Sequence, residues 1–135
     1  EIYILDIQGD LATTVDRAVY ITPNNDTSGT YFSHMHRVDA SPTSFVEVYS
    51  SLQGIMVGRS VYSTNGTLSI QSKLYAKSGY RRQAISSGVF YASQSQNGLS
   101  NVQGTWSNTS SNITSLVVNF NGGTFTGNWW IYSIR

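Results

Sequence analysis

The sequence predicts an all-β protein, an antiparallel β-sandwich of jelly-roll type with about ten short strands. Apolar and polar residues alternate with a period of two along most of the chain, which is typical of half-buried strands. Turn-forming stretches rich in Gly, Asn, Asp, Ser and Pro return about every ten residues. The 135 residues suffice for one domain with a core. We therefore expect a single domain over 1–135.

The clearest strand lies at 66–77, where Leu68, Ile70 and Leu74 share one face and polar residues occupy the other. The preceding Asn65-Gly66 pair is typical of a two-residue hairpin, so we expect 54–64 and 66–77 to be antiparallel neighbours. Residues 10–18 could form one short helical turn. The other expected strands are 2–7, 17–22, 30–38, 44–50, 80–86, 88–93, 102–107, 115–120 and 126–134.

The final strand carries apolar side chains on both faces. Trp130, Tyr132 and Ile134 share one face, and Trp129 and Ile131 lie on the other. Such a strand is buried between two packed layers, or one of its faces meets another subunit. We therefore expect it to be a central strand and not an edge.

The composition is rich in apolar residues and poor in charge, with 39% hydrophobic, 13% aromatic and 11% charged residues. All seven acids lie in the first 47 residues, whose net charge is −5, and the remainder carries six cations and no acid. The basic residues form no cluster, so we expect no nucleic-acid partner. Instead, acidic and basic strands should meet within the fold or between subunits.

The chain has no cysteine, which fits folding in a bacterial cytosol. No apolar run approaches the length that spans a membrane, so we expect no membrane insertion. It begins with Glu1 and not Met, and we interpret it as the C-terminal end of a longer protein.

The sequence does not predict an enzyme. Glu47 is the most interesting acid, since it shares a strand face with Phe45 and Tyr49, but a cation such as Arg59 is the simpler partner. No Gly-x-Ser-x-Gly elbow, Ser–His–Asp set or phosphate-binding loop is present. We expect no catalytic residue and no cofactor.

Exposed aromatic rings beside polar groups are typical of glycan-binding sites, where a ring packs on the C–H face of a sugar. The stretch 74–83 offers this combination, and Trp106 lies among small polar residues. Packing within the sandwich is the competing interpretation for each ring. The candidate ligand-binding residues are Tyr75, Lys77, Tyr80, Arg81, Arg82 and Trp106.

The C-terminal stretch NITSLVVNFNGGTFTGNWWIYSIR (112–135) resembles the ending of small β-sandwich domains in tailed-bacteriophage tail fibres, tailspikes and other virion appendages. There a similar strand leads through a Gly-rich turn into a last strand with an aromatic residue and an Ile. The resemblance covers only this ending and carries no ligand residues. This chain departs from it in having two adjacent tryptophans.

The resemblance implies a virion domain, a homotrimer, and recognition of the host surface, most often of a polysaccharide. Two alternatives stay open: a purely structural decoration or fibre cap without a ligand, and a free-standing lectin-like module.

His34 and His36 lie two residues apart and therefore share a strand face. Three chains around an axis would supply six imidazole nitrogens to a metal, an arrangement that resembles the His-x-His motif of some phage fibres. Two exposed histidines on a polar face are the simpler interpretation. We expect no bound metal, with His34 and His36 as the candidates if one is held.

Overall fold

The computed structural model describes residues 1–13, 17–28, 30–40, 44–51, 53–60, 63–93 and 96–134. The described residues form ten strands and no helix, which confirms the predicted fold class. The described segments therefore include no apolar helix of the length that spans a bilayer. The strands are β1 (Ile2–Thr13), β2 (Arg17–Pro23), β3 (Tyr31–Asp39), β4 (Ser44–Ser51), β5 (Ile55–Ser60), β6 (Ser63–Tyr75), β7 (Arg82–Ser93), β8 (Gln96–Trp106), β9 (Leu116–Asn119) and β10 (Thr124–Ile134).

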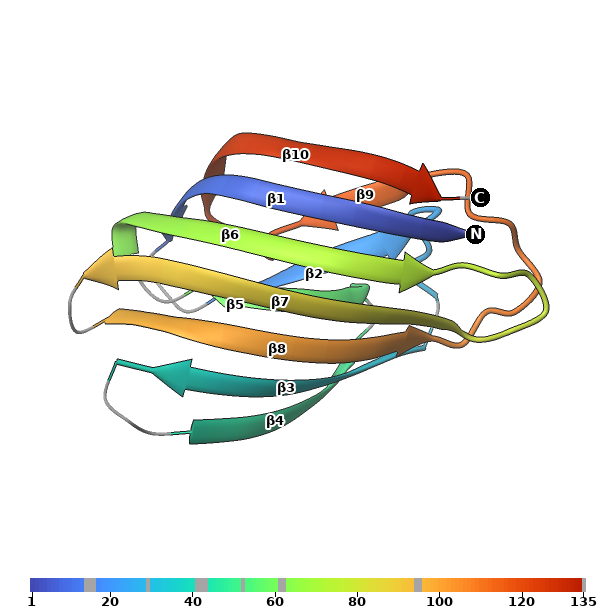
Figure 1. Cartoon of the computed structure of the whole chain (residues 1–135), viewed down its shortest axis with the longest axis horizontal. Coiled ribbons are helices and arrows are strands. Elements are labelled where there is room, and N and C mark those ends of the chain that lie inside the picture. Colours follow the sequence, from blue (N-terminus) through green and yellow to red (C-terminus); the bar gives the residue numbers. More distant parts are fainter. Residues whose placement is uncertain are drawn as a thin grey trace.

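The strands form two antiparallel layers of unequal size. The large sheet has seven strands in the order β10-β1-β6-β7-β8-β3-β4, and the small sheet has three in the order β5-β2-β9. In Figure 1 the large sheet lies in front and the small sheet lies behind it. This seven-and-three division fits a β-sandwich, whereas the predicted jelly-roll topology is not confirmed.

The core lies between the two sheets and follows the alternation of the sequence. Leu68, Ile70 and Leu74 of β6 point into it, as predicted, and Leu5 and Ile7 of β1 join them. Each of these side chains is at most 3% exposed. The small sheet contributes Val19, Ile21, Ile55 and Val57 to the same cluster.

The predicted hairpin at Asn65-Gly66 is wrong. Both residues lie within β6, and β5 pairs with β2 in the small sheet instead of with β6. Gly66 pairs with Leu11, next to a shift of register in β1 between Leu11 and Thr13. The Asn-Gly pair thus accompanies a bulge and not a turn, because pairing of β6 with β1 and β7 outweighs the local turn preference.

The predicted helical turn in 10–18 is not seen where the structure describes that stretch. Residues 10–13 belong to β1 and residues 17–18 to β2, while 14–16 lie outside the described residues. The strands expected at 80–86 and 88–93 are one continuous strand, β7.

The final strand is an edge, which corrects the prediction of a central strand. β10 stands at the end of the large sheet, where β1 is its only partner among the described strands. Trp129 is 50% exposed and Trp130 is 43% exposed, so neither face is covered there, whereas Phe125 near the start of the strand packs against the core. The pairing of β10 with β1 runs from Thr124 to Ile134 without a register shift.

Candidate functional site

The outer face of the large sheet is open, because the small sheet packs against the opposite face. Antiparallel pairing aligns the outward side chains of neighbouring strands into rows that cross the sheet. One such row contains Gln71 of β6, Ser87 of β7 and Asn101 of β8. These three side chains are exposed and none carries a charge.

Four adjoining hollows of about 270, 310, 380 and 410 Å³ form a shallow trough across this face. Neighbouring hollows share residues, among them Ile85, Ser87 and Val89 of β7. We use the name trough for the continuous surface that runs from Phe32 and His34 on β3, over these β7 residues, to Gln8 and Asp10 on β1.

The floor of the trough is hollow because its central side chains are short. Ser69 and Ser87 lie beside longer Gln71 and Asn101, which form part of the wall. The amide of Gln71 is held in place, since its Nε2 donates a hydrogen bond to Oδ1 of Asp6 at 2.9 Å. The trough therefore presents oriented amide groups beside small hydroxyl groups.

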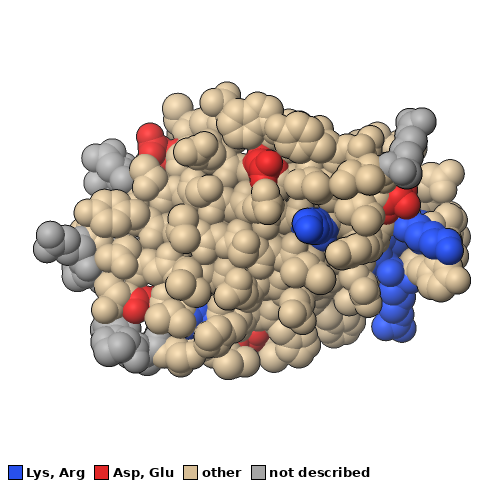
Figure 2. Space-filling view, viewed as in Figure 1, with Lys and Arg blue, Asp and Glu red and all other residues tan. Residues whose placement is uncertain are grey.

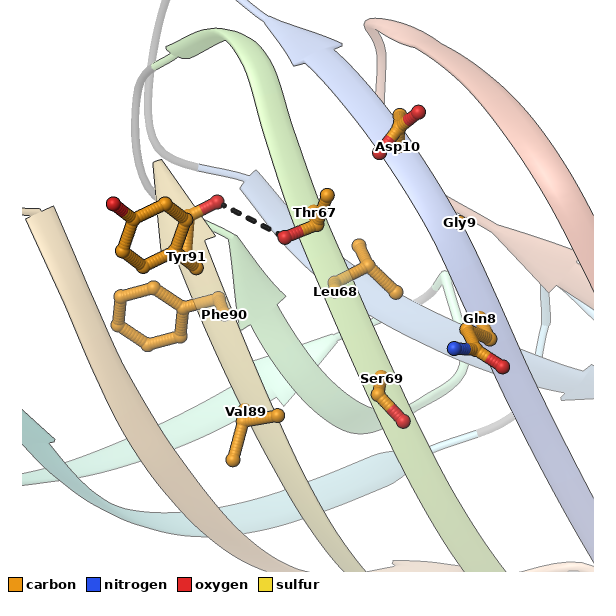
Figure 3. A pocket seen from close by; sticks show the side chains of 9 residues that line it. All are labelled: Gln8, Gly9, Asp10, Thr67, Leu68, Ser69, Val89, Phe90 and Tyr91. Carbon is orange, nitrogen blue, oxygen red and sulfur yellow. Dashed lines mark hydrogen bonds between the residues drawn. The ribbon is translucent and has the colours of Figure 1, made fainter. Parts of the chain in front are cut away.

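One end of the trough, drawn in Figure 3, combines rings and polar groups from three strands. Gln8, Ser69 and Val89 form one row, and Asp10, Thr67 and Tyr91 form the next. The hydroxyl of Thr67 donates a hydrogen bond to the carbonyl oxygen of Tyr91 at 3.3 Å. Tyr91 and Val89 are more than half exposed and offer apolar surface.

The charge of this face is low. Figure 2 shows a surface on which acidic and basic groups are few and mostly lie toward the margins. Asp6 does not line any of the four hollows. Among the residues that do, only Asp10 and Lys73 carry a full charge. Such a surface does not favour a highly charged polymer and suits a neutral polar one.

The predicted binding loop is only partly exposed. Tyr75 lies on the outer face beside Gln83, and Tyr80 and Arg81 are exposed at the β6–β7 connection. Lys77 places its Nζ 4.9 Å from the centre of the Tyr80 ring. The structure thus brings Lys77 and Tyr80 together at the end of the sheet, while their predicted role in ligand binding stays a prediction.

Arg82 and Trp106 are not available to a ligand, which corrects two of the predicted site residues. Both are fully buried, with no exposed surface. The Arg82 guanidinium lies 5.7 Å from the Trp106 ring centre and donates hydrogen bonds to the carbonyl oxygens of Tyr80, Asn108 and Ser111. Indole Nε1 of Trp106 donates to Asp26, so both side chains have structural roles.

Glu47 lies on the inner face of β4, in the row of Met35, and pairs with Arg59. The distance from Arg59 Nη1 to Glu47 Oε2 is 2.8 Å, which confirms the simpler of the two predictions. This pair also joins the acidic first segment to the basic remainder within the fold. Tyr49 donates a hydrogen bond to the same carboxylate. Burial is the larger cause and this hydrogen bond the second cause that raise the pKa of Tyr49 to about 12.

Two acids, Asp6 and Asp10, lie four residues apart on the outer side of β1. At the rise of a strand their Cα atoms are about 14 Å apart. The two acids belong to different rows of the sheet, Asp6 opposite Gln71 and Asp10 opposite Thr67.

His34 and His36 are exposed on β3 and share the outer face, as predicted. Nε2 of His36 lies 2.6 Å from the hydroxyl of Ser44, and His34 lines the trough. Within the described residues no group of three or more His, Cys, Asp or Glu side chains could hold a metal ion. A site that needs three chains around an axis stays a prediction.

Sequence reasoning missed the residues of the trough, such as Gln71, Ser87 and Asn101. A signal was present, because many outward positions of three consecutive strands are Ser, Asn, Gln or Thr, and Lys73 is the one charged residue among the outward positions that β6, β7 and β8 contribute to the hollows. Only the register, however, places these residues in one row.

No family model, no curated protein and no solved structure matches this chain.

Proposed function

We propose that this chain is a non-catalytic binding module whose trough holds a neutral polysaccharide. The observation that carries the proposal is the trough itself, where uncharged amide and hydroxyl groups alternate with apolar surface across five strands. Amides and hydroxyls can exchange hydrogen bonds with sugar hydroxyls. Val89, Ile85 and Tyr91 offer apolar surface to the C–H faces of the sugar rings.

The length of the trough favours a chain-like ligand over a single small molecule. The hollows follow one another along β7, from Ile85 to Tyr91, and together reach from β3 to β1, a width of about 20 Å at the usual strand spacing. A polysaccharide can place successive rings in successive hollows. A small molecule would instead favour one deep pocket.

Recognition of a host-surface polysaccharide by a virion appendage is the biological setting that we propose, and it rests on the C-terminal resemblance. A purely structural virion domain is the second candidate. The observation that favours it is the exposed apolar surface of β10, which suits assembly with another chain. A measured ligand for the trough would separate the two candidates.

The test is binding of the purified chain to immobilised neutral and acidic polysaccharides, with Asn101→Ala and Ser87→Tyr as variants. The first removes an amide from the wall, and the second fills the floor. Asn112→Ala, at an exposed position outside the trough, is the matched control for Asn101→Ala. We expect both trough variants to lose binding to a neutral polysaccharide and the control to retain it.

Retention of binding by both folded trough variants, or the absence of any neutral ligand for the wild-type chain, would overturn the proposal. The predicted loop provides a competing site. If Tyr80→Ala with Arg81→Ala abolishes binding while Ser87→Tyr does not, the ligand binds at the β6–β7 connection instead.

A further inference from the structure

The open edge of β10 carries a cluster of exposed apolar side chains that the trough does not explain. Trp129, Trp130, Tyr132 and Ile134 are each between 43% and 53% exposed, and Ile131 is 37% exposed. They occupy five of the six positions from 129 to 134 on one strand and lie on both of its faces. Exposing such an apolar cluster to water is unfavourable, and clusters of this kind mark interaction surfaces.

β10 also lacks the features that protect edge strands from pairing. Proteins usually guard an edge with Lys, Pro, a bulge or a covering loop. The segment Thr124–Ile134 contains no charged residue and no proline, and its pairing with β1 has no bulge. At the other edge of the sheet, β4 carries Glu47, which points inward and pairs with Arg59.

We propose that β10 pairs with β10 of a second copy of this chain, antiparallel and around a two-fold axis. The axis stands perpendicular to the large sheet, because only this operation reverses strand direction while keeping like faces together. The result is one continuous sheet of fourteen strands, twice the seven of a single copy. The proposal is independent of any ligand in the trough.

The geometry of β10 sets the register. The strand curves near its start (Figure 1), and Gly127 there pairs with Gly9 of β1, so we take Asn128–Ile134 as the segment that pairs. The centre of this segment is Ile131, which then meets its own copy. Trp130 faces Tyr132 of the second copy on the outer face, twice by symmetry, and such aromatic pairs stabilise sheets.

The area and charge of this edge suit a second copy. Half-exposed aromatic side chains offer about 100 Å² each, so two copies with their backbones bury at most on the order of 1,000 Å², where specific interfaces begin. An uncharged strand meets its copy without repulsion. A partner of opposite charge would find no group to recognise on β10.

The first test is the mass of the wild-type chain by sedimentation equilibrium over a range of concentrations. We expect a dimer that dissociates on dilution, and we expect Ile131→Lys to be monomeric at concentrations where the wild type is dimeric. Val48→Lys, an exposed residue of the β4 edge, is the matched control and should remain dimeric. Circular dichroism and thermal unfolding verify that the lysine variants fold.

A disulfide test fixes the register, because the chain contains no cysteine. Ile131→Cys places two thiols directly opposite each other across the axis, with Cβ atoms about 4.5 Å apart at the closest, and should form a covalent dimer on mild oxidation. Val48→Cys should not. A wild-type chain that stays monomeric at all concentrations, forms the trimer that the resemblance implies, or assembles into open filaments through β10 and β4 would overturn the proposal.

Discussion

Arg82 shows how a charged side chain beside a predicted binding loop becomes part of the interior. It follows Arg81 directly, and successive strand residues point to opposite faces, so one arginine is exposed and the other is buried. The buried guanidinium donates to carbonyl oxygens at 80, 108 and 111 and thereby holds the connection after β8. The doubled arginine in the sequence gives no sign of this division.

We expect Arg82→Lys to lower the free energy of unfolding by about 2–3 kcal/mol, because an ammonium cannot replace the planar fork that serves several carbonyl oxygens. Urea unfolding measures the change. Arg81→Lys is the matched control and should change stability by less than about 0.5 kcal/mol. Equal stability of the two variants would contradict the structural role of Arg82.

Tyr49 and Tyr31 predict alkaline sensitivity. Burial raises the pKa of each to about 12 from the ordinary 10.0, with the hydrogen bond to Glu47 adding to the effect at Tyr49 and the charge of Asp26 at Tyr31. A raised pKa means that the folded state favours the neutral phenol. Their contribution to stability is therefore complete below pH 10 and is lost as the pH rises from 10 to 12.

We expect the urea midpoint to fall between pH 10 and 12, and Tyr49→Phe to make this fall shallower, since phenylalanine does not ionise. Tyr80→Phe, at an exposed position, is the matched control. An identical profile for Tyr49→Phe and the wild type would show that Tyr49 titrates alike in both states.

At the scale of elements, the pair of strands β1 and β10 depends on two facing glycines. A Cβ atom on Gly127 would lie 2.4 Å from the carbonyl oxygen of Gln8 and 2.6 Å from Cα of Gly9. These are backbone atoms, so they cannot move aside as a flexible side chain can. The close approach of the two strands therefore requires glycine at this position.

Gly127→Ala should destabilise the fold by about 1–3 kcal/mol, the usual cost of overpacking. Thermal or urea unfolding measures it, and Ser133→Ala on the same strand should stay within about 0.5 kcal/mol of the wild type. A neutral Gly127→Ala would mean that β10 can shift away from β1 without loss.

The period of two predicted most strands and the inward faces of β6, because burial on one face enforces it. It could not assign the partners of each strand. Asn65-Gly66 has the local preference for a turn, yet the pairing of Leu68 and its neighbours with two strands of the large sheet outweighs it. The apolar residues on both faces of β10 led to the prediction that this strand lies in the centre of the sheet. A pattern of apolar residues does not distinguish a strand buried within a sheet from an edge strand that pairs with a second copy.

At the scale of the whole molecule, the fold class was predictable and the trough was not. Alternation and turn spacing indicate a sandwich without any knowledge of strand order. The trough instead arises from Gln71, Ser87 and Asn101, which come together only when the register of three strands is fixed. A slip of one residue would move each of them into the core.

The low charge of the trough predicts that binding is insensitive to salt. We expect the affinity for a neutral polysaccharide to change less than about twofold between 0.05 and 0.5 M salt, because no ion pair forms for salt to screen. Titration calorimetry at the two concentrations measures it. A steep fall of affinity with salt would indicate a charged ligand that binds the cationic side chains of Lys77 and Arg81.

The two ends of the chain leave the molecule side by side, since Ile2 pairs with Ile134 on neighbouring antiparallel strands (Figure 1). A pulling force applied between these ends acts across the ladder of hydrogen bonds and not along the strands. The bonds of β1 and β10 then break one after another, starting from Ile2 and Ile134, instead of together in shear. When the domain is pulled from its own ends, β1 and β10 should separate at low force. A second copy paired with β10 would not strengthen the pairing between β1 and β10.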